Sequence, residues 1–109
     1  MINKDFFKKI RILDGGMGQE LLARGMKPNS TLWSANAILD ENYHQLVLDT
    51  HIDFIKAGAE IIVTTTFATR QKRLKENNLL DKFEYLNQKG RSNCSSCKTK
   101  VLGNFFFAV

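Results

Sequence analysis

An acid followed by two glycines ends the first apolar run of the chain, in the order Ile12-Leu13-Asp14-Gly15-Gly16. If this run is a strand and a helix begins just after it, one carboxylate and several bare backbone N–H groups lie together at the positive end of the helix dipole. Such a site suits the zwitterion of an amino acid, with the carboxylate facing the ammonium and the amides facing the substrate's carboxylate. The alternative is that Asp-Gly-Gly is only a turn, as such dipeptides commonly are.

Hydroxyl groups follow the second apolar run. Residues 60–64 form a β-branched run without alternation, which is typical of a strand buried on both faces of a parallel sheet. Thr64, Thr65 and Thr66 stand after this strand as Asp14 stands after the first. Right-handed connections bring the carboxyl ends of parallel strands to one edge of a sheet, where open α/β sheets and (β/α)8 barrels bind ligands. We therefore expect these hydroxyls near Asp14.

The segments around these two groups predict alternating strands and helices. Residues 10–13 form the first strand, and residues 19–24 and 40–57 have the spacing of helices, each followed by a glycine. Leucines and aromatic residues over 74–86 indicate one or two further helices, with a break at Asn77-Asn78. The order strand, helix, strand, helix defines an α/β chain, and it lacks the glycine-rich patterns of nucleotide-binding loops.

The stretch between the first two helices holds the chain's only Pro and only Trp. Residues 26–36 show no steady period and predict a loop, from which Trp33 could cover a binding pocket or simply pack. On the helix that follows, His51 shares an apolar face with Val47 and Phe54. We therefore interpret His51 as a hydrogen-bonded core residue and not as a metal ligand.

Composition limits the class of protein. The chain has 109 residues, 43% of them hydrophobic, which suffices for one domain with an ordinary core. No apolar run approaches the ~20 residues of a membrane span, and the first residues lack the apolar stretch of a signal peptide, so we expect a cytoplasmic protein without a membrane partner. Much of the net charge of +5 lies after residue 89, in Arg91, Lys98 and Lys100, and we expect no nucleic-acid partner.

Both cysteines lie near the end of the chain, as the pair Cys94 and Cys97 in a Cys-x-x-Cys pattern. Such a pair can be half of a zinc site or a redox pair, but a zinc site needs further ligands at a matching spacing. The only histidines, His44 and His51, fall on a predicted helix much earlier in the chain. We therefore expect no metal site from these residues.

Residues 10–89 contain a series of short motifs, which are, in order, Leu13-Asp14-Gly15-Gly16-Met17-Gly18, Leu32-Trp33-Ser34-Ala35, His51, Ala57-Gly58-Ala59 and Thr64-Thr65-Thr66-Phe67-Ala68-Thr69-Arg70. In this order and spacing they closely resemble the homocysteine S-methyltransferase family. The resemblance implies a (β/α)8 TIM barrel, of which this chain would be the amino-terminal βα units in truncated form, since such barrels usually need ~250 residues. It also favours a substrate site at Asp14 over a plain turn.

The family's activity, as the resemblance implies it, is the transfer of a methyl group from S-methylmethionine, S-adenosylmethionine or a betaine to zinc-activated homocysteine, which forms methionine. Coordination to the metal lowers the pKa of the thiol, so that a nucleophilic thiolate exists at neutral pH. By the same resemblance, Asp14 would hold the substrate's ammonium group, and the amides of Gly15 and Gly16 would meet its amino-acid end. The other residues that it places around the pocket are Thr64 or Thr66, with Trp33 and Phe67 near the donor.

One departure from the family affects the expected activity. The family's zinc ligands are cysteines late in the barrel, and Cys94 and Cys97 match their motifs neither in context nor in position. We therefore expect this chain to bind no zinc and to be inactive as it stands. An alternative from another class is a small non-catalytic binding protein whose basic Cys-x-x-Cys tail contacts nucleic acid or metal.

The sequence changes character at residue 90. We expect residues 1–89 to be the amino-terminal part of a homocysteine-binding barrel domain and residues 90–109 to be a non-matching tail. Synonymous codons exist for which the tail, read one nucleotide later, contains Ile-Ala-Val-Ala-Ala, a piece of the amphipathic helix that the family has there. A frameshift is therefore our hypothesis for the tail, and resequencing the gene across this point tests it. The apolar residues 105–109 also predict aggregation.

Overall fold

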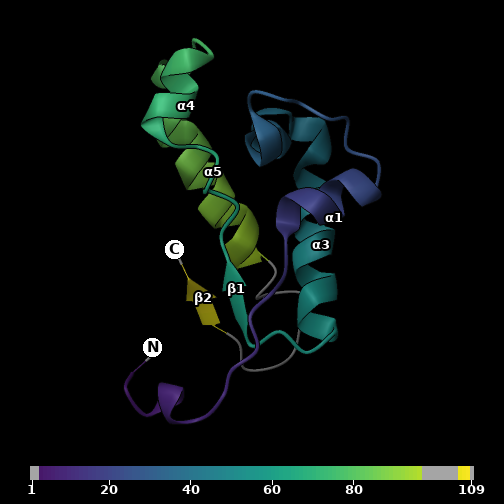
Figure 1. Ribbon diagram of the computed structural model, residues 1–109, viewed down its shortest axis with the longest axis vertical. Coiled ribbons are helices and arrows are strands. Elements are labelled where there is room, and N and C mark those ends of the chain that lie inside the picture. The colour runs from purple at the N-terminus through teal and green to yellow at the C-terminus, as the bar shows by residue number, and fades with distance from the viewer. Residues whose placement is uncertain (1–2, 97–105, 109) are drawn as a thin grey trace.

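The computed structural model describes residues 3–96 and the backbone of residues 106–108, and it is mostly helical (Figure 1). In chain order its elements, with η for a 3-10 helix, are η1 (Phe6–Lys8), α1 (Met17–Ala23), η2 (Trp33–Ala35), α2 (Asn36–Leu39), η3 (Glu41–Tyr43), α3 (His44–Lys56), β1 (Ile61–Val63), α4 (Gln71–Glu76), η4 (Leu80–Lys82), α5 (Phe83–Ser96) and β2 (Phe106–Ala108). In Figure 1, α1 and α4 lie above the strands, and α3 runs down beside β1. No helix among the described residues is long and apolar enough to cross a membrane.

Parallel pairing joins the first apolar run, β1 and β2. The register of β1 and β2 is Ile61↔Phe106, Ile62↔Phe107 and Val63↔Ala108. At its other edge β1 meets the first apolar run, where Leu13 and Ile61 form a single parallel bridge. The C=O of Ile12 accepts a hydrogen bond from the N–H of Ile61 at 3.1 Å, and the N–H of Asp14 donates to the C=O of Ile61 at 3.0 Å. The predicted order of parallel segments separated by helices is therefore present.

Two details of these segments differ from the sequence-based prediction. A strand over residues 10–13 is wrong apart from the bridge at Leu13, because the chain approaches β1 only at the end of this run and Ile10 is 95% exposed. The prediction that β1 is buried on both faces holds for Ile61 and Ile62, whose side chains point to opposite faces, but not for Val63 at the end of the strand, which is 40% exposed.

Helix ends occur where the sequence predicts them. Oδ1 of Asp40 accepts a hydrogen bond from the N–H of Asn42 at 3.0 Å, and η3 and α3 follow directly. Gly58 has a φ of +115°, a left-handed conformation that favours glycine, and α3 stops before it. The predicted break between the later helices lies at Asn78, which has a φ of +57° between α4 and η4.

The main core joins all the helices from α1 to α5. Its buried apolar side chains are Leu21, Met26, Ala37, Ile38, Val47, Leu74 and Leu86. A separate cluster places Cys94 of α5 against Ile62 of β1 and against Ala59, which precedes β1. Because α3 and α5 both pack near β1, the loops that follow the first apolar run and β1 are held against a common core.

The predicted loop over residues 26–36 holds more structure than its irregular sequence indicates. η2 and the beginning of α2 lie inside it. Oδ1 of Asn29 accepts a hydrogen bond from the N–H of Leu32 at 2.8 Å, which turns the chain toward η2. Leu32 and Ala35 are then buried against Ala68. Tertiary contacts therefore order this stretch, although its sequence has no helical period.

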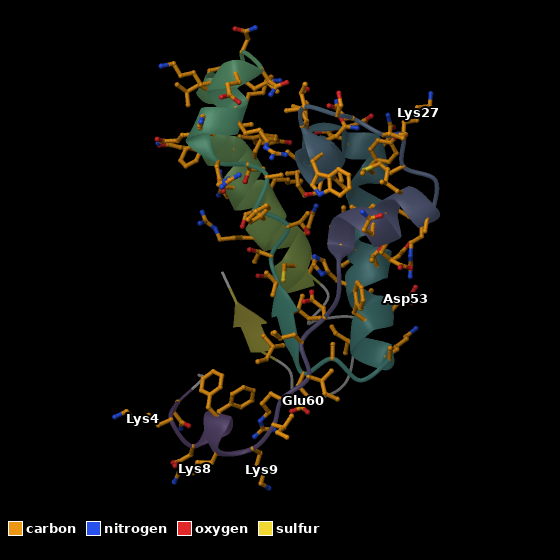
Figure 2. All side chains as sticks on the ribbon, viewed as in Figure 1. Lys4, Lys8, Lys9, Lys27, Asp53 and Glu60 are labelled. Atoms are coloured by element: carbon orange, nitrogen blue, oxygen red, sulfur yellow. The ribbon has the colours of Figure 1, made fainter. Side chains whose placement is uncertain are left out.

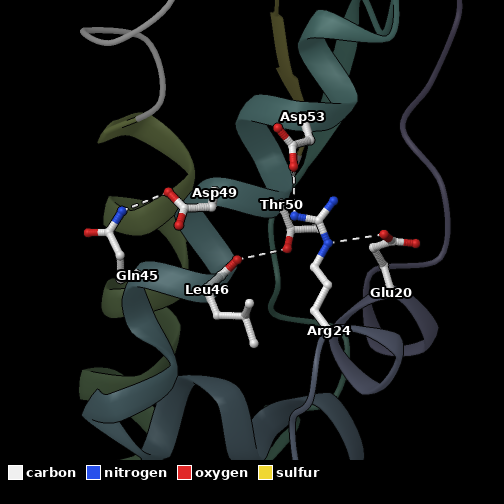
Figure 3. Close-up of polar contacts among 7 residues, drawn as sticks. All are labelled: Glu20, Arg24, Gln45, Leu46, Asp49, Thr50 and Asp53. Carbon is white, nitrogen blue, oxygen red and sulfur yellow. Dashed lines mark hydrogen bonds and ion pairs between the residues drawn. The ribbon is translucent and has the colours of Figure 1, made fainter.

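An ionic contact holds α1 against α3 and so positions the loop before α1 (Figure 3). Nε of Arg24 lies 3.0 Å from Oε1 of Glu20 in α1, and its Nη1 lies 2.7 Å from Oδ2 of Asp53 in α3. The hydrogen bond to Asp53, and then that to Glu20, raise the pKa of the Arg24 guanidinium. Because these groups are partly exposed, the contact orients the two helices more than it stabilises the fold.

α5 continues across the predicted division of the chain at residue 90. A Cβ added to Gly90 would lie 2.8 Å from Cγ2 of Thr66 and 3.2 Å from the C=O oxygen of Thr65, so α5 packs directly on the residues that follow β1. The division at residue 90 stays a prediction. The predictions for Cys97 and for the side chains of residues 105–109 lie outside the described residues.

Candidate functional site

A pocket of about 250 Å³ lies where the loop of Asp14, η2 and the residues after β1 meet. The predicted site residues that line it are Asp14, Gly15, Gly16, Trp33, Thr64 and Phe67. Thr66 does not line it, but its hydroxyl lies 2.9 Å from that of Thr64 and forms a hydrogen bond with it. The structure therefore brings the predicted residues together from distant parts of the chain and leaves Thr66 beside them.

A larger cavity of about 720 Å³ lies elsewhere, along α4, η4 and α5. Its lining includes Lys72, Lys75, Asp81 and Glu84, and none of the predicted site residues. These side chains are exposed and carry charges of both signs, as on a solvated surface groove. A ligand site instead combines enclosure with a few convergent polar groups, and the pocket at Asp14 fits that description better.

Asp14 links its loop to the end of β1. Its Oδ2 accepts a hydrogen bond from the N–H of Val63 at 3.1 Å. Burial raises the pKa of the Asp14 carboxyl, and the N–H groups of Val63 and of Asp14 itself oppose that rise. An ammonium group in the pocket would favour the ionised carboxylate and offset the cost of its burial, as expected for a binding acid. The bond to Val63 by itself is one that a turn-forming acid would also make.

Trp33 packs against the first turn of α1. A Cβ added to Gly18 would lie 2.7 Å from Nε1 and 2.9 Å from Cε2 of the indole, closer than side-chain atoms approach. A Cβ on Gly15 would lie 3.0 Å from Cε1 of Phe54. Close packing on Trp33 therefore favours glycine at position 18, a role that the sequence analysis did not assign, and the contact of Gly15 with Phe54 is tight. Trp33, which is 37% exposed, forms one wall of the pocket.

Replacing Gly18 by valine is expected to displace Trp33, because the new side chain would occupy the space of the indole. Trp33 is the chain's only tryptophan, so fluorescence reports its position, and we expect emission at longer wavelength in Gly18→Val. Gly16→Ala is the control, since the nearest atom to a Cβ there, on Gln19, is 4.0 Å away. Unchanged emission in Gly18→Val would contradict the packing of the indole on α1.

A pair of polar side chains that the sequence analysis did not single out ties the loop after β1 to α5. Oγ1 of Thr69 donates to Oδ1 of Asn87 at 2.8 Å, and Nδ2 of Asn87 donates to the C=O of Thr69 at 3.1 Å. The same loop carries Phe67, which is 70% exposed at the pocket and has the Arg70 guanidinium 4.8 Å from its ring centre. Thr69 and Asn87 are too far apart in the sequence for a local pattern to predict their contact.

His51 supports the threonine loop from inside the core. Its side chain is fully buried, and its Nε2 forms a long hydrogen bond of 3.4 Å with Oγ1 of Thr65, which lines the pocket. Burial lowers the pKa of His51 to about 4, so the ring is neutral near pH 7. Its Nδ1 has no hydrogen-bond partner among the described residues. The prediction of a core histidine is confirmed.

The described residues do not assemble a metal site. Among them, no group of His, Cys, Asp or Glu side chains is arranged to hold a metal ion. Cys94 is buried beside Ala59 and Ile62, outside the pocket, and Cys97 is not among the described residues. The zinc that the resemblance implies for the full-length family therefore does not fit this part of the chain.

Comparison with known proteins identifies the family of this chain. The sequence model of the family described as Homocysteine S-methyltransferase matches residues 11–107. The chain belongs to this family. The matched range includes every residue that lines the pocket and extends past residue 90.

The curated relatives are much longer than this chain. Homocysteine S-methyltransferase 2 of Saccharomyces cerevisiae is 38% identical over 78 residues, which cover 64% of this chain and 24% of the relative. Homocysteine S-methyltransferase 1 of the same yeast is 37% identical over 76 residues, 63% of this chain and 24% of the relative. Homocysteine S-methyltransferase of Escherichia coli is 36% identical over 58 residues, 53% of this chain and 18% of the relative. The chain spans about a quarter of the yeast relatives. No solved structure matches it significantly.

Proposed function

We propose that this chain is the amino-terminal part of a homocysteine S-methyltransferase barrel and binds the amino-acid end of homocysteine. In the whole enzyme, a methyl group would pass from S-methylmethionine, S-adenosylmethionine or a betaine to the sulfur of homocysteine, which gives methionine. The proposal is supported by the meeting of Asp14, Gly15, Gly16 and Thr64 in one pocket of a chain from this family. The parallel order of the first apolar run, β1 and β2 is that of adjacent strands in such a barrel.

The pocket residues divide between the two substrates. The Asp14 carboxylate holds the ammonium group of homocysteine, and its partial burial strengthens this contact because less water screens it. The N–H groups of Gly15 and Gly16 meet the substrate's carboxylate. Trp33 and Phe67 offer aromatic faces on the donor side, where a positively charged onium group is favoured.

The proposal includes no metal step through this chain's residues. For the full-length family, the resemblance implies a zinc ion that holds homocysteine as a thiolate. The described residues provide no ligand set for that ion, so they account for binding and orientation only. The alternative of a metal-binding or nucleic-acid-binding tail has no support among them either.

Replacing Asp14 by asparagine is expected to weaken homocysteine binding roughly ten- to hundredfold, because the ammonium loses a charge-assisted hydrogen bond of about 1.5–3 kcal/mol. The 109-residue chain is titrated with L-homocysteine, and binding is followed through the emission of Trp33 in the pocket wall.

Asp49→Asn is the matched control for this change. Asp49 is exposed on α3 and contacts Gln45, outside the pocket, so its replacement should leave the Kd for homocysteine unchanged. Far-ultraviolet circular dichroism checks that both variants keep their helices. An equal Kd for the wild type and Asp14→Asn would assign Asp14 to turn structure, and absence of saturable binding by the wild type would contradict the proposed function.

A further inference from the structure

The residues after β1 form a tight turn that carries part of the pocket wall. The N–H of Thr69 donates to the C=O of Thr66 at 3.2 Å, which closes a turn over residues 66–69. Phe67, the second residue of this turn, lines the pocket. The hydroxyl of Thr66, the first residue, is bonded to that of Thr64, which also lines the pocket. A shift of the turn would therefore move two parts of the pocket wall.

Asn87 of α5 holds the last residue of this turn by its main chain and by its side chain. Nδ2 of Asn87 donates to the C=O of Thr69 at 3.1 Å, and its Oδ1 lies 2.8 Å from Oγ1 of Thr69. Nδ2 also donates to the C=O of Phe83, one helical turn earlier in α5, at 2.9 Å. Both N–H groups of the amide and its oxygen therefore have partners. Because the bond to Phe83 fixes the amide on α5, the amide holds Thr69 at a fixed place beside the helix.

The hydroxyl of Thr69 extends this contact to the start of the turn. Thr69 is fully buried, and its Oγ1 lies 2.9 Å from the C=O oxygen of Thr66, which makes that oxygen its second acceptor beside Asn87. A hydroxyl has a single hydrogen, which these two acceptors share. The polar contacts therefore run without interruption from Asn87 through Thr69 and Thr66 to the Thr64 hydroxyl in the pocket.

Other contacts hold the residues after β1 less directly. Figure 2 shows α3, on which Asp53 is labelled, beside the end of β1. α3 reaches Thr65 through His51, but that hydrogen bond, at 3.4 Å, is longer than usual. Gly90 of α5 packs closely on Thr66, and such a contact limits how near the helix comes without directing a polar group. The two contacts of Asn87 with Thr69 are shorter and directional, so they decide where the turn lies.

We infer that Asn87 is a positioning residue for homocysteine binding, which fixes the Thr64 hydroxyl in the pocket through the turn of residues 66–69. Asn87 is not among the residues that line the pocket, so it acts only through others. Whichever hydroxyl donates in the bond between Thr64 and Thr66, the Thr64 oxygen keeps a lone pair that can accept from an ammonium group beside Asp14. The inference rests on the proposed function, since it takes homocysteine as the ligand of this pocket.

Replacing Asn87 by aspartate tests the inference, because this change keeps the size of the side chain and removes both N–H groups. Binding of L-homocysteine, followed through the emission of Trp33, should weaken about tenfold. Asn77→Asp is the matched control and introduces the same charge. Nδ2 of Asn77 donates to the C=O of Arg73, four residues earlier, at 2.8 Å, but Asn77 contacts neither the turn nor the pocket. Its Kd should equal that of the wild type.

A second background separates positioning from general stabilisation. In a chain that carries Thr64→Val, which lacks the pocket hydroxyl, Asn87→Asp should weaken homocysteine binding by less than about threefold, because both changes act on the same contact. If Asn87 only stabilised the fold, the factor would be the same in both backgrounds. Thr69→Val, which removes the hydroxyl between Asn87 and Thr66, should weaken binding in the same direction. It replaces Asn87→Asp in the test if circular dichroism shows that Asn87→Asp loses its helices.

Hydrogen exchange of the free chain provides a measurement that needs no ligand. Followed by mass spectrometry, exchange over residues 64–69 should become about tenfold faster in Asn87→Asp, while exchange in α1 stays unchanged. Equal Kd values for the wild type and Asn87→Asp, an equal factor in both backgrounds, or unchanged exchange over residues 64–69 overturns the inference. Faster exchange in a chain whose wild type shows no saturable homocysteine binding refutes the proposed function and keeps Asn87 as the residue that positions the turn.

Discussion

Methionine formation by the isolated 109-residue chain is expected to stay at the rate observed without protein. In the proposal, the described residues hold the amino-acid end of homocysteine, but no group of His, Cys, Asp or Glu among them could hold the metal that converts its thiol to a thiolate. The expected loss relative to a whole enzyme is its entire acceleration, on the order of 10⁶-fold or more.

The assay supplies homocysteine and zinc with S-methylmethionine, S-adenosylmethionine or betaine in turn, and methionine is quantified by mass spectrometry. The full-length yeast Homocysteine S-methyltransferase 2, prepared in parallel, shows that the reagents and the detection work. Turnover that increases in proportion to the purified chain, and that persists after a further purification step, would contradict the prediction. It would mean that residues outside the described ones complete the site.

The free energy of unfolding is expected to fall by up to about 3 kcal/mol as the pH is lowered from 7 to below 4, because of His51 alone. Burial lowers the pKa of His51 to about 4 from the ordinary value of 6.5. Between these values the unfolded chain binds a proton that the folded chain does not. The stability that neutral His51 contributes above pH 6.5 is therefore lost progressively down to about pH 4.

Denaturant unfolding at a series of pH values measures this effect. His51→Gln removes the titrating group and should flatten the dependence between pH 4 and 6.5, whatever its effect on stability at pH 7. Asp14 acts in the opposite direction, since its raised pKa favours the folded chain as the pH falls, and it is common to both proteins. Equal slopes in the wild type and His51→Gln would show that folding does not lower the pKa of His51.

Local sequence signals determined the helix ends, the second strand and the polar residues of the site. Gly58 takes a positive φ that favours glycine, and Asp40 caps the turn before α3, so adjacent residues sufficed to predict where that helix begins and ends. Asp14 and Thr64 were predicted to be neighbours because each follows a segment of parallel pairing, and such segments end at one edge. The motifs around them also sufficed to indicate the family.

Only the tertiary structure decided which backbone groups pair and what forms the walls of the pocket. The strand predicted over residues 10–13 reduces to a bridge at Leu13, because a strand needs a paired neighbour and β1 reaches only the end of that run. Trp33 rests on Gly18, and Asn87 holds the loop after β1 through Thr69. Caps, turns and strand propensity depend on adjacent residues, whereas close packing and long-range hydrogen bonds depend on neighbours that only folding brings together.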